Sequence, residues 1–390
     1  MSDLLNGRWQ ETKEALLEGL NGTRRSSMSV TLENTRKYLA ESASAGATSA
    51  GNVATLNRVI LPVIRRVMPT VIANELVGVQ PMTGPVGQIH TLRVRYSDTS
   101  ANAGVLAGEE ALSPFKIAAS YSGNETAATP KAGSTATLEG AAGKRMSIQI
   151  LKQVVEAKTR KLSARWTFEA AQDAQAQQGI DIEAEIMAAL AQEITAEIDQ
   201  EILGSLRSLA GTAVETYNQA AVSGTATFVG DEHAALAVQI NRAANLIAQR
   251  TRRGAGNYAV VSPTVLTLLQ SATTSAFART TEGTFEAPTN TKFVGTLNSA
   301  MKVYVNGYAT TDNVLIGYKG SSESDAPAFY CPYIPLMSSG VVLDPATFEP
   351  VVSFMTRYGY VELTNTASSL GNAADYLAKV AVTSANLRFA

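Results

Sequence analysis

Residues 181–210 read DIEAEIMAALAQEITAEIDQEILGSLRSLA and carry the strongest helix signal in the chain. Asp181 can cap the start of this helix, and Gly211 can close its end. A helix of this length spans roughly 45 Å. Its apolar residues recur at four-residue steps, at Ile182, Ile186, Leu190, Ile194, Ile198, Ile202 and Leu206.

The spacing of that apolar line predicts how the helix packs. Each four-residue step turns the line by roughly 40°, so the line winds part of the way around the helix. The two ends must therefore bury different faces, as in a rigid bar that bridges two parts of a large fold. An ordinary core helix fits the same pattern. A coiled coil does not, because its repeat is nearer to about 3.5 residues. An acidic line winds beside the apolar one, at Glu185, Glu193, Glu197 and Glu201.

Composition sets the class of protein. The chain has 390 residues, enough for two or three domains, and a net charge of −2. Such a balance gives no general attraction to nucleic acid or membranes. One cysteine, Cys331, excludes an internal disulfide. No apolar run approaches the roughly 20 residues of a transmembrane helix, and the first residues, MSDLLNGRWQ, lack the order of a signal peptide. We expect a soluble intracellular product.

The first part of the chain reads as an appendage. Residues 1–41 carry a weak helical pattern, and residues 42–51 (SASAGATSAG) have the composition of a flexible linker. Residues 52–87 hold a helical piece that Pro62 and Pro69 break into short segments. We therefore predict an N-terminal arm and linker over 1–51, followed by a lead-in segment over 52–87.

Two strand patterns flank a long stretch of small residues. Residues 88–96 alternate as a strand, and Met146, Ile148 and Ile150 alternate again. Residues 97–143 between them are mostly Ala, Gly, Ser and Thr. The pattern favours a long hairpin arm that cannot bury itself and lies on something else, although a disordered insertion fits the composition equally well.

The strand that returns from this hairpin is expected to continue through residues 152–165, the most basic segment of the chain. It lacks the interleaved aromatic residues and the reading helix of a nucleic-acid site, so pairing with glutamates of another chain is the favoured explanation. Thr167 can cap a short helix that runs to Gln178. From Asp231 onward, a helix at 234–250 is followed by predicted strands at 258–261, 293–294, 301–305, 313–318, 329–335, 351–363 and 378–387.

Catalytic patterns are missing from the sequence. His90 and His233 have no partner at metal-ligand spacing, and neither a nucleophile elbow nor a phosphate-binding loop occurs. Cys331 lies in an aromatic strand run and is interpreted as a small core residue. We therefore expect no enzyme, no cofactor and no metal.

Several long runs resemble one protein family, the major capsid proteins of T-even-like contractile-tailed bacteriophages. Gln80-Pro81-Met82, followed by Gly84-Pro85 and Gly87-Gln88, is the most distinctive match. Further matches keep their order along the chain, at 152–179 (KQVVEAKTRKLSARWTFEAAQDAQAQQG), 252–262 (RRGAGNYAVVS), 302–320 (KVYVNGYATTDNVLIGYKG), 325–335 (DAPAFYCPYIP) and 348–359 (FEPVVSFMTRYG).

The resemblance implies the Hong Kong 97-type capsid fold, an α+β architecture. It places an extended hairpin loop at 88–151, a peripheral domain at 152–230 with the spine helix at 181–210, an axial domain at 231–345 that shares strands with the peripheral domain, and C-terminal strands at 346–390 that return to the peripheral domain. In the family a phage protease removes an N-terminal arm after a Leu-x-Glu site, which Leu39, Ala40 and Glu41 match. Leu16-Leu17-Glu18 matches as well.

The function implied is that of a major capsid protein, which self-assembles as hexamers and pentamers into the icosahedral shell around double-stranded phage DNA. Vertex, portal, scaffold and decoration proteins would be its partners, and the virion, assembled in the bacterial cytoplasm, its location. The family's inserted domain in the extended loop has no counterpart here. An α/β enzyme or binding protein with a disordered insertion, or a non-viral compartment shell, are the alternatives. The charged residues predicted at subunit interfaces are Glu109, Glu110, Lys158, Arg160 and Lys161.

Overall fold

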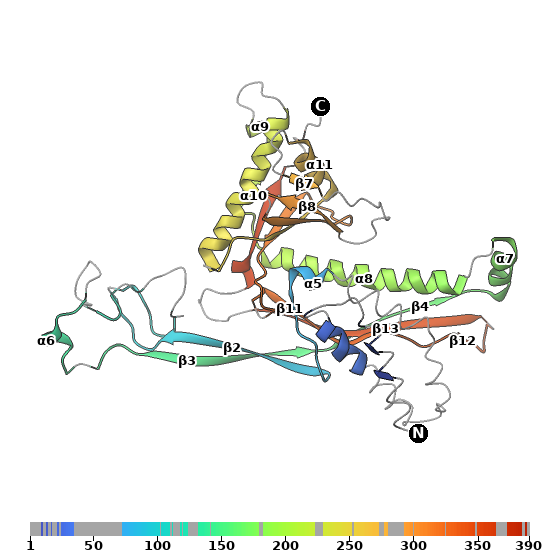
Figure 1. Cartoon of the computed structure of the whole chain (residues 1–390), viewed down its shortest axis with the longest axis horizontal. Helices are drawn as coiled ribbons and strands as arrows, with labels where there is room; N and C mark the ends of the chain where they lie inside the picture. The colour runs from blue at the N-terminus through green and yellow to red at the C-terminus, as the bar shows by residue number, and fades with distance from the viewer. Residues whose placement is uncertain are drawn as a thin grey trace.

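A computed structural model gives the fold of the chain (Figure 1). It combines helices with three antiparallel or mixed sheets, as the predicted α+β class requires. No described helix combines the length and apolar composition needed to cross a lipid bilayer. The structure describes residues 9–10, 13–14, 17, 22, 25–34, 72–101, 103–109, 111, 118, 120–123, 132–140, 142–178, 182–222, 229–251, 253–272, 277–279, 292–298, 300–323, 325–347, 349–363, 373–383 and 387.

The predicted long helix is helix α8 (Ile182–Leu209). It ends as expected, because Gly211 follows with a φ of +65°, a conformation that glycine adopts without strain. Asp181, the predicted cap, lies outside the described residues. The short helix α7 (Phe168–Gln178) precedes it, and the hydroxyl of Thr167 accepts a hydrogen bond from the backbone of Ala170 at 3.3 Å.

A five-stranded sheet lies along one side of α8 (Figure 1). Its centre is the antiparallel pair β11 (Ala328–Ser338) and β13 (Pro350–Glu362). Strand β4 (Lys158–Arg165) pairs with β13 on the side opposite β11. The short strand β12 (Val342–Leu343) also pairs with β13, at Val351 and Pro350. The two-residue strand β1 (Gly78–Val79) joins β11 in parallel.

A seven-stranded mixed sheet forms the second lobe, in the order β5-β14-β10-β6-β9-β8-β7. Helices α10 (Val229–Thr251) and α11 (Pro263–Ser271) pack on it, and the hydroxyl of Ser262 caps α11 by accepting a hydrogen bond from the backbone of Val265. The strands are β5 (Glu215–Tyr217), β6 (Tyr258–Val261), β7 (Phe277–Arg279), β8 (Lys292–Leu297), β9 (Met301–Val305), β10 (Asn313–Gly317) and β14 (Leu377–Val382).

The position of β14 corrects one expectation. The C-terminal strands were expected to return to the peripheral domain, and β13 does, but β14 pairs with β10 and β5 in the seven-stranded sheet. The reason is that its apolar residues pack into the hydrophobic cores that flank the seven-stranded sheet. Leu377 packs into the core around α8, while Ala378 and Val380 pack into the core under α10.

Helix α8 lies between the two sheets and shares one hydrophobic core with both. Tyr330 and Phe354 enter this core from the five-stranded sheet, and Val260 and Leu315 enter it from the seven-stranded sheet. The prediction of a bar that joins two parts of a large fold is therefore confirmed. The winding apolar line follows from it, because successive turns face different neighbours.

The third sheet is the hairpin of β2 (Val86–Tyr96) and β3 (Met146–Glu156), which extends away from the body (Figure 1). The predicted continuous strand over 146–165 breaks at Ala157, whose backbone N–H donates to the carbonyl of Pro85 at 2.9 Å. On one side of this break the chain pairs with β2, and on the other side it pairs with β13. Smaller elements are α5 (Ala73–Leu76), α6 (Thr135–Leu138), α9 (Gln219–Val222) and a 3-10 helix (Ala373–Tyr376).

Candidate assembly surfaces

The β2–β3 hairpin attaches to the body at its base through one of its two faces. Val155 of β3 is 2% exposed there, and the side-chain amide of Gln153 donates to the carbonyl of Glu362 in β13 at 3.1 Å. Because side chains alternate along a strand, the neighbours of these residues point to the opposite face. The hairpin therefore leans on the five-stranded sheet with one face and turns the other outward.

The outward face of β3 is exposed and mostly apolar, although Lys152 also lies on it. Ile148 and Ile150 are 68% and 66% exposed, and Met146 and Val154 on the same face are each about half exposed. Scattered exposed apolar side chains are normal, whereas four of them on one face of one strand, interrupted only by Lys152, indicate a contact surface. We call these four residues, Met146, Ile148, Ile150 and Val154, the hairpin face.

The described part of the hairpin tip folds around a small core of its own. Tyr96, Val105, Ala111 and Tyr121 are buried together, and the hydroxyl of Tyr121 donates to the carbonyl of Arg145 at 2.6 Å. Of the two explanations for residues 97–143, this favours an ordered arm over a disordered insertion for the residues that the structure describes.

One of the two predicted interface acids lies in this tip. Glu109 closes a tight turn, because its carboxylate accepts a hydrogen bond from the backbone of Leu106 at 3.2 Å and its carbonyl accepts one from Tyr96 at 2.9 Å. Its described contacts are therefore structural ones. Glu110 lies outside the described residues. An interface role for either acid stays a prediction.

Arg160 joins three elements: strand β4, helix α8 and strand β13. From β4 its guanidinium reaches Glu197 of α8 at 2.6 Å and Glu201 of α8 at 2.5 Å, and its Nε donates to the hydroxyl of Tyr358 in β13 at 2.6 Å. The Tyr358 hydroxyl in turn donates to Glu201. Burial opposes the charges, but the hydrogen bonds outweigh it, raising the pKa of Arg160 and lowering the pKa of Glu201.

This cluster corrects the expected pairing of the basic segment. Arg160 meets glutamates, as predicted, but they belong to its own chain rather than to another. The reason is register: Arg160 pairs with Thr356 across the ladder, which directs its side chain toward α8. Lys158 and Lys161 are exposed on the same strand. For all three residues, a place at a subunit interface stays a prediction.

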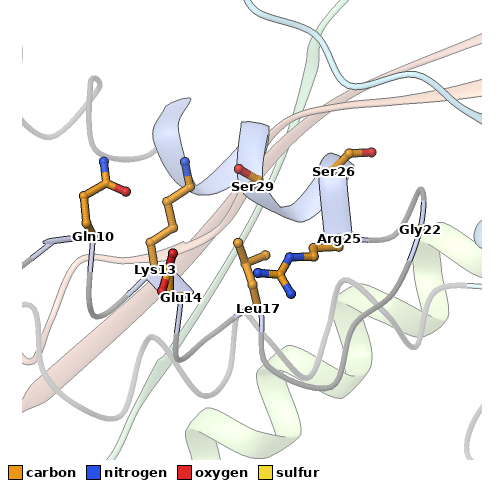
Figure 2. Close-up of a pocket in the computed structure, with 8 residues that line it drawn as sticks. All are labelled: Gln10, Lys13, Glu14, Leu17, Gly22, Arg25, Ser26 and Ser29. Carbon is orange, nitrogen blue, oxygen red and sulfur yellow. The ribbon is translucent and has the colours of Figure 1, made fainter.

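The N-terminal arm is described over a helical stretch at 25–34 and a few residues before it. A hollow of about 440 Å³ lies within this arm. Its lining, drawn in Figure 2, has one apolar residue, Leu17, and otherwise polar side chains and a glycine. Lys13 at its wall forms an ion pair with Glu33 at 3.5 Å. Leu39, Ala40 and Glu41 lie outside the described residues.

The residues that were weighed for chemistry occupy structural positions. Burial raises the pKa of the Cys331 thiol to about 12, so it stays protonated in the core, as predicted. His233 is buried, and its Nδ1 lies 2.5 Å from the hydroxyl of Ser271. His90 is exposed on the hairpin. Among the described residues, no group of three His, Cys, Asp or Glu side chains could hold a metal ion.

Asp199 of α8 is a buried acid that the sequence reasoning missed. It is 1% exposed, its Oδ1 accepts the backbone N–H of Ile72 at 2.9 Å, and its Oδ2 has no partner among the described residues. Burial raises its pKa to about 7, and the hydrogen bond from Ile72 only partly opposes this. Its spacing was a usable signal, since Asp199 lies four residues from buried Thr195 and from buried Leu203.

Comparison with known proteins identifies the family of this architecture. The sequence model of the family "Major capsid protein Gp23" matches residues 53–382. The major capsid protein of Vibrio phage KVP40 is 31% identical, over 85% of this chain and 82% of its own length. That of Enterobacteria phage T4 is also 31% identical, over 83% of this chain and 78% of its own length.

The chain belongs to the Gp23 major capsid protein family. This membership confirms the resemblance and the head-shell function predicted from the sequence, and it does not favour an enzyme, a binding protein or a non-viral shell. Solved structures that share features with this Gp23-family chain include the capsid of Myoviridae phage XM1, at 12% identity, a TM-score of 0.46 and coverage of 80% and 92% of the two chains. A chain from Microbacterium phage Oxtober96 matches at 11% identity, a TM-score of 0.47 and coverage of 80% and 90%.

Proposed function

We propose that this capsid protein builds its shell by laying the hairpin face of each copy on a neighbouring copy. The observation that carries this is the exposed row of Met146, Ile148, Ile150 and Val154 on an arm that extends from the body. Removing each exposed side chain from water contributes roughly 1–2 kcal/mol. A single contact of this size is weak. A closed shell repeats it in every subunit, so the contributions add by multivalency.

We extend the proposal to the wider assembly, with the family membership as its support. Copies form hexamers and pentamers, with vertex, portal, scaffold and decoration proteins as further partners, and the shell encloses double-stranded DNA in the virion after assembly in the bacterial cytoplasm. The net charge of −2 supports a container that does not grip its genome. In this proposal the chain acts mechanically, through contacts between copies, rather than as an enzyme.

A pair of lysine substitutions on opposite faces of β3 tests the docking proposal. Ile148→Lys places a charge on the hairpin face, where docking would bury it at a cost that an unpaired ammonium cannot recover. Gln149→Lys adds the same charge to the next residue, whose side chain is exposed on the other face. We expect Ile148→Lys to yield folded subunits that form no shells in electron micrographs, and Gln149→Lys to form normal shells.

Two outcomes would contradict the proposal. If Ile148→Lys subunits assemble as the parent does, the hairpin face is not a contact surface. If both variants fail to assemble although circular dichroism shows that they are folded, the hairpin is sensitive to charge on either face, and the apolar row is not the reason.

We also propose that the arm is removed after Glu41. Support comes from the Leu39-Ala40-Glu41 match directly before the small-residue linker. The intact mass of the subunit from mature heads should then begin at Ser42. A mass that begins at Met1 would make the arm a permanent part of the shell, and one that begins at Gly19 would assign the cut to the Leu16-Leu17-Glu18 match.

A further inference from the structure

We propose that the arm helix over residues 25–34 acts as a latch. It fixes the base of the hairpin to the five-stranded sheet through the side chain of Asn34. The inference concerns the freedom of the hairpin within one subunit. It rests on the proposed function only in taking the hairpin as the docking element, and its test needs no assembly.

The latch begins with two hydrogen bonds from one side chain. Asn34 is 7% exposed, and its Nδ2 donates to the carbonyl of Met82 at 2.7 Å and to the carbonyl of Tyr333 at 2.9 Å. An amide nitrogen has two N–H groups, so both are used. These acceptors lie on different segments: Met82 precedes β2, whereas Tyr333 belongs to β11. One side chain of the arm therefore ties the lead-in of the hairpin to the sheet.

The Tyr333 carbonyl lies where the sheet gives it no regular donor. Tyr333 lies at a register shift in the β11–β13 ladder, between Pro332 and Ile334, where regular pairing is interrupted. Leaving this partly buried carbonyl without a donor would cost up to about 1–3 kcal/mol, and Asn34 supplies the donor that the interrupted ladder does not. The apolar residues Met28 and Leu32 of the same helix are 2% and 0% exposed, which holds the helix in place around this bond.

Met82 is the residue through which the latch acts on the hairpin. Its side chain packs against Gly87 at the start of β2 and Gly359 in β13, at positions where any Cβ would come within 3.4 Å of it. Its backbone N–H donates to Pro332 at 3.0 Å, and that of Gln80 donates to Tyr330 at 3.0 Å. Swinging the hairpin base away from β11 would break these two backbone bonds. The Asn34 bridge spans the same two segments and opposes that motion.

The test measures hydrogen exchange at the amides of Gln80 and Met82 in the full chain, held as unassembled subunits. Asn34→Asp keeps the size of the side chain, removes both donors and points a carboxylate at two carbonyls. Asn34→Ala removes the donors without adding charge, and serves if the aspartate variant does not fold. Gln10→Glu is the matched control, because it makes the same amide-to-carboxylate change at an exposed position of the arm.

We expect exchange at Gln80 and Met82 to become at least about tenfold faster in both Asn34 variants, as expected when a latch worth one or two buried hydrogen bonds is lost. The buried amides of β6 and β9 should exchange as in the parent, and Gln10→Glu should change nothing. Unchanged exchange at Gln80 and Met82 would overturn the proposal. Equal acceleration at β6 and β9 would overturn it too, because the arm would then stabilise the whole subunit rather than the hairpin base.

Discussion

A single buried carboxylate, Asp199, makes the stability of the subunit depend on pH. Its folded-state pKa is about 7, above the ordinary value of 3.8. The folded chain therefore holds this proton more tightly, and the stability it confers is complete below about pH 4 and is lost as the pH rises through 7. Asn cannot ionise and keeps an oxygen for the N–H of Ile72. We expect the stability of Asp199→Asn relative to the parent to rise by about 4 kcal/mol between pH 4 and pH 8.

Urea unfolding at several pH values would measure this difference. The quantity to compare is the change in stability with pH, because near pH 4 the protonated carboxyl leaves one buried O–H donor without an acceptor whereas the amide leaves two N–H donors. Glu193→Gln is the control, since it removes an exposed acid from the same helix. If the free energy of unfolding of the parent does not fall relative to that of Asp199→Asn between pH 4 and pH 8, the prediction is wrong. Asp199 would then ionise at little cost, because water or a local movement reaches it.

The sequence predicts the contacts of some of these residues and not of others. Arg160 was predicted to meet glutamates, because it lies in the most basic segment and glutamates line the long helix. Which chain supplies them depends on the ladder register between β4 and β13, which local spacing does not encode. Asn34 was missed because its acceptors, at Met82 and Tyr333, are distant in the sequence and are created by a fold-level irregularity.

At the scale of elements, periodicity predicted what is locally determined. The long helix, its glycine stop, the Thr167 and Ser262 caps and strand β6 all follow from signals within a few residues. The break at Ala157 and the sheet that takes β14 do not, because both are decided by partners elsewhere in the chain. Burial in β14 alternates from Ala378 to Val382, which is typical of a strand with one buried face, but such alternation does not specify which sheet the strand joins.

The attachment of α8 to β4 gives a prediction for the element as a whole. Arg160→Gln removes the guanidinium that meets Glu197, Glu201 and Tyr358, and leaves their polar atoms partly buried. We expect a loss of about 1–3 kcal/mol in the free energy of unfolding, measured by thermal or urea unfolding of unassembled subunits. Lys161→Gln is the matched control on the same strand, and as an exposed site it should change stability by less than about 0.5 kcal/mol.

The opposite pattern would be equally informative. If Arg160→Gln leaves the subunit as stable as the parent but prevents assembly, the guanidinium acts between subunits. Its contacts with Glu197 and Glu201 then do not stabilise the subunit. If both variants are as stable as the parent and both assemble, the basic strand carries neither role.

At the scale of the whole molecule, two kinds of surface compete as the main contact between copies. The hairpin face is apolar, whereas the edge strand β4 presents Lys158 and Lys161. A chain with a net charge of −2 gains little from long-range attraction or repulsion between copies, so the chemistry of the local contacts decides assembly. These surfaces respond to different conditions, which makes them separable without any mutation.

Salt screens exposed charges, with a Debye length of about 10 Å at 0.1 M and about 3 Å at 1 M, but it does not weaken apolar burial. Cooling does weaken apolar burial. If the hairpin face dominates, shell formation followed by light scattering should persist when NaCl is raised from about 0.1 M to about 1 M, and should fall when the sample is cooled from about 30 °C to about 4 °C. If salt dissolves the shells and cooling has no effect, the charged residues of β4 make the main contact instead. The hairpin face then contributes little to assembly.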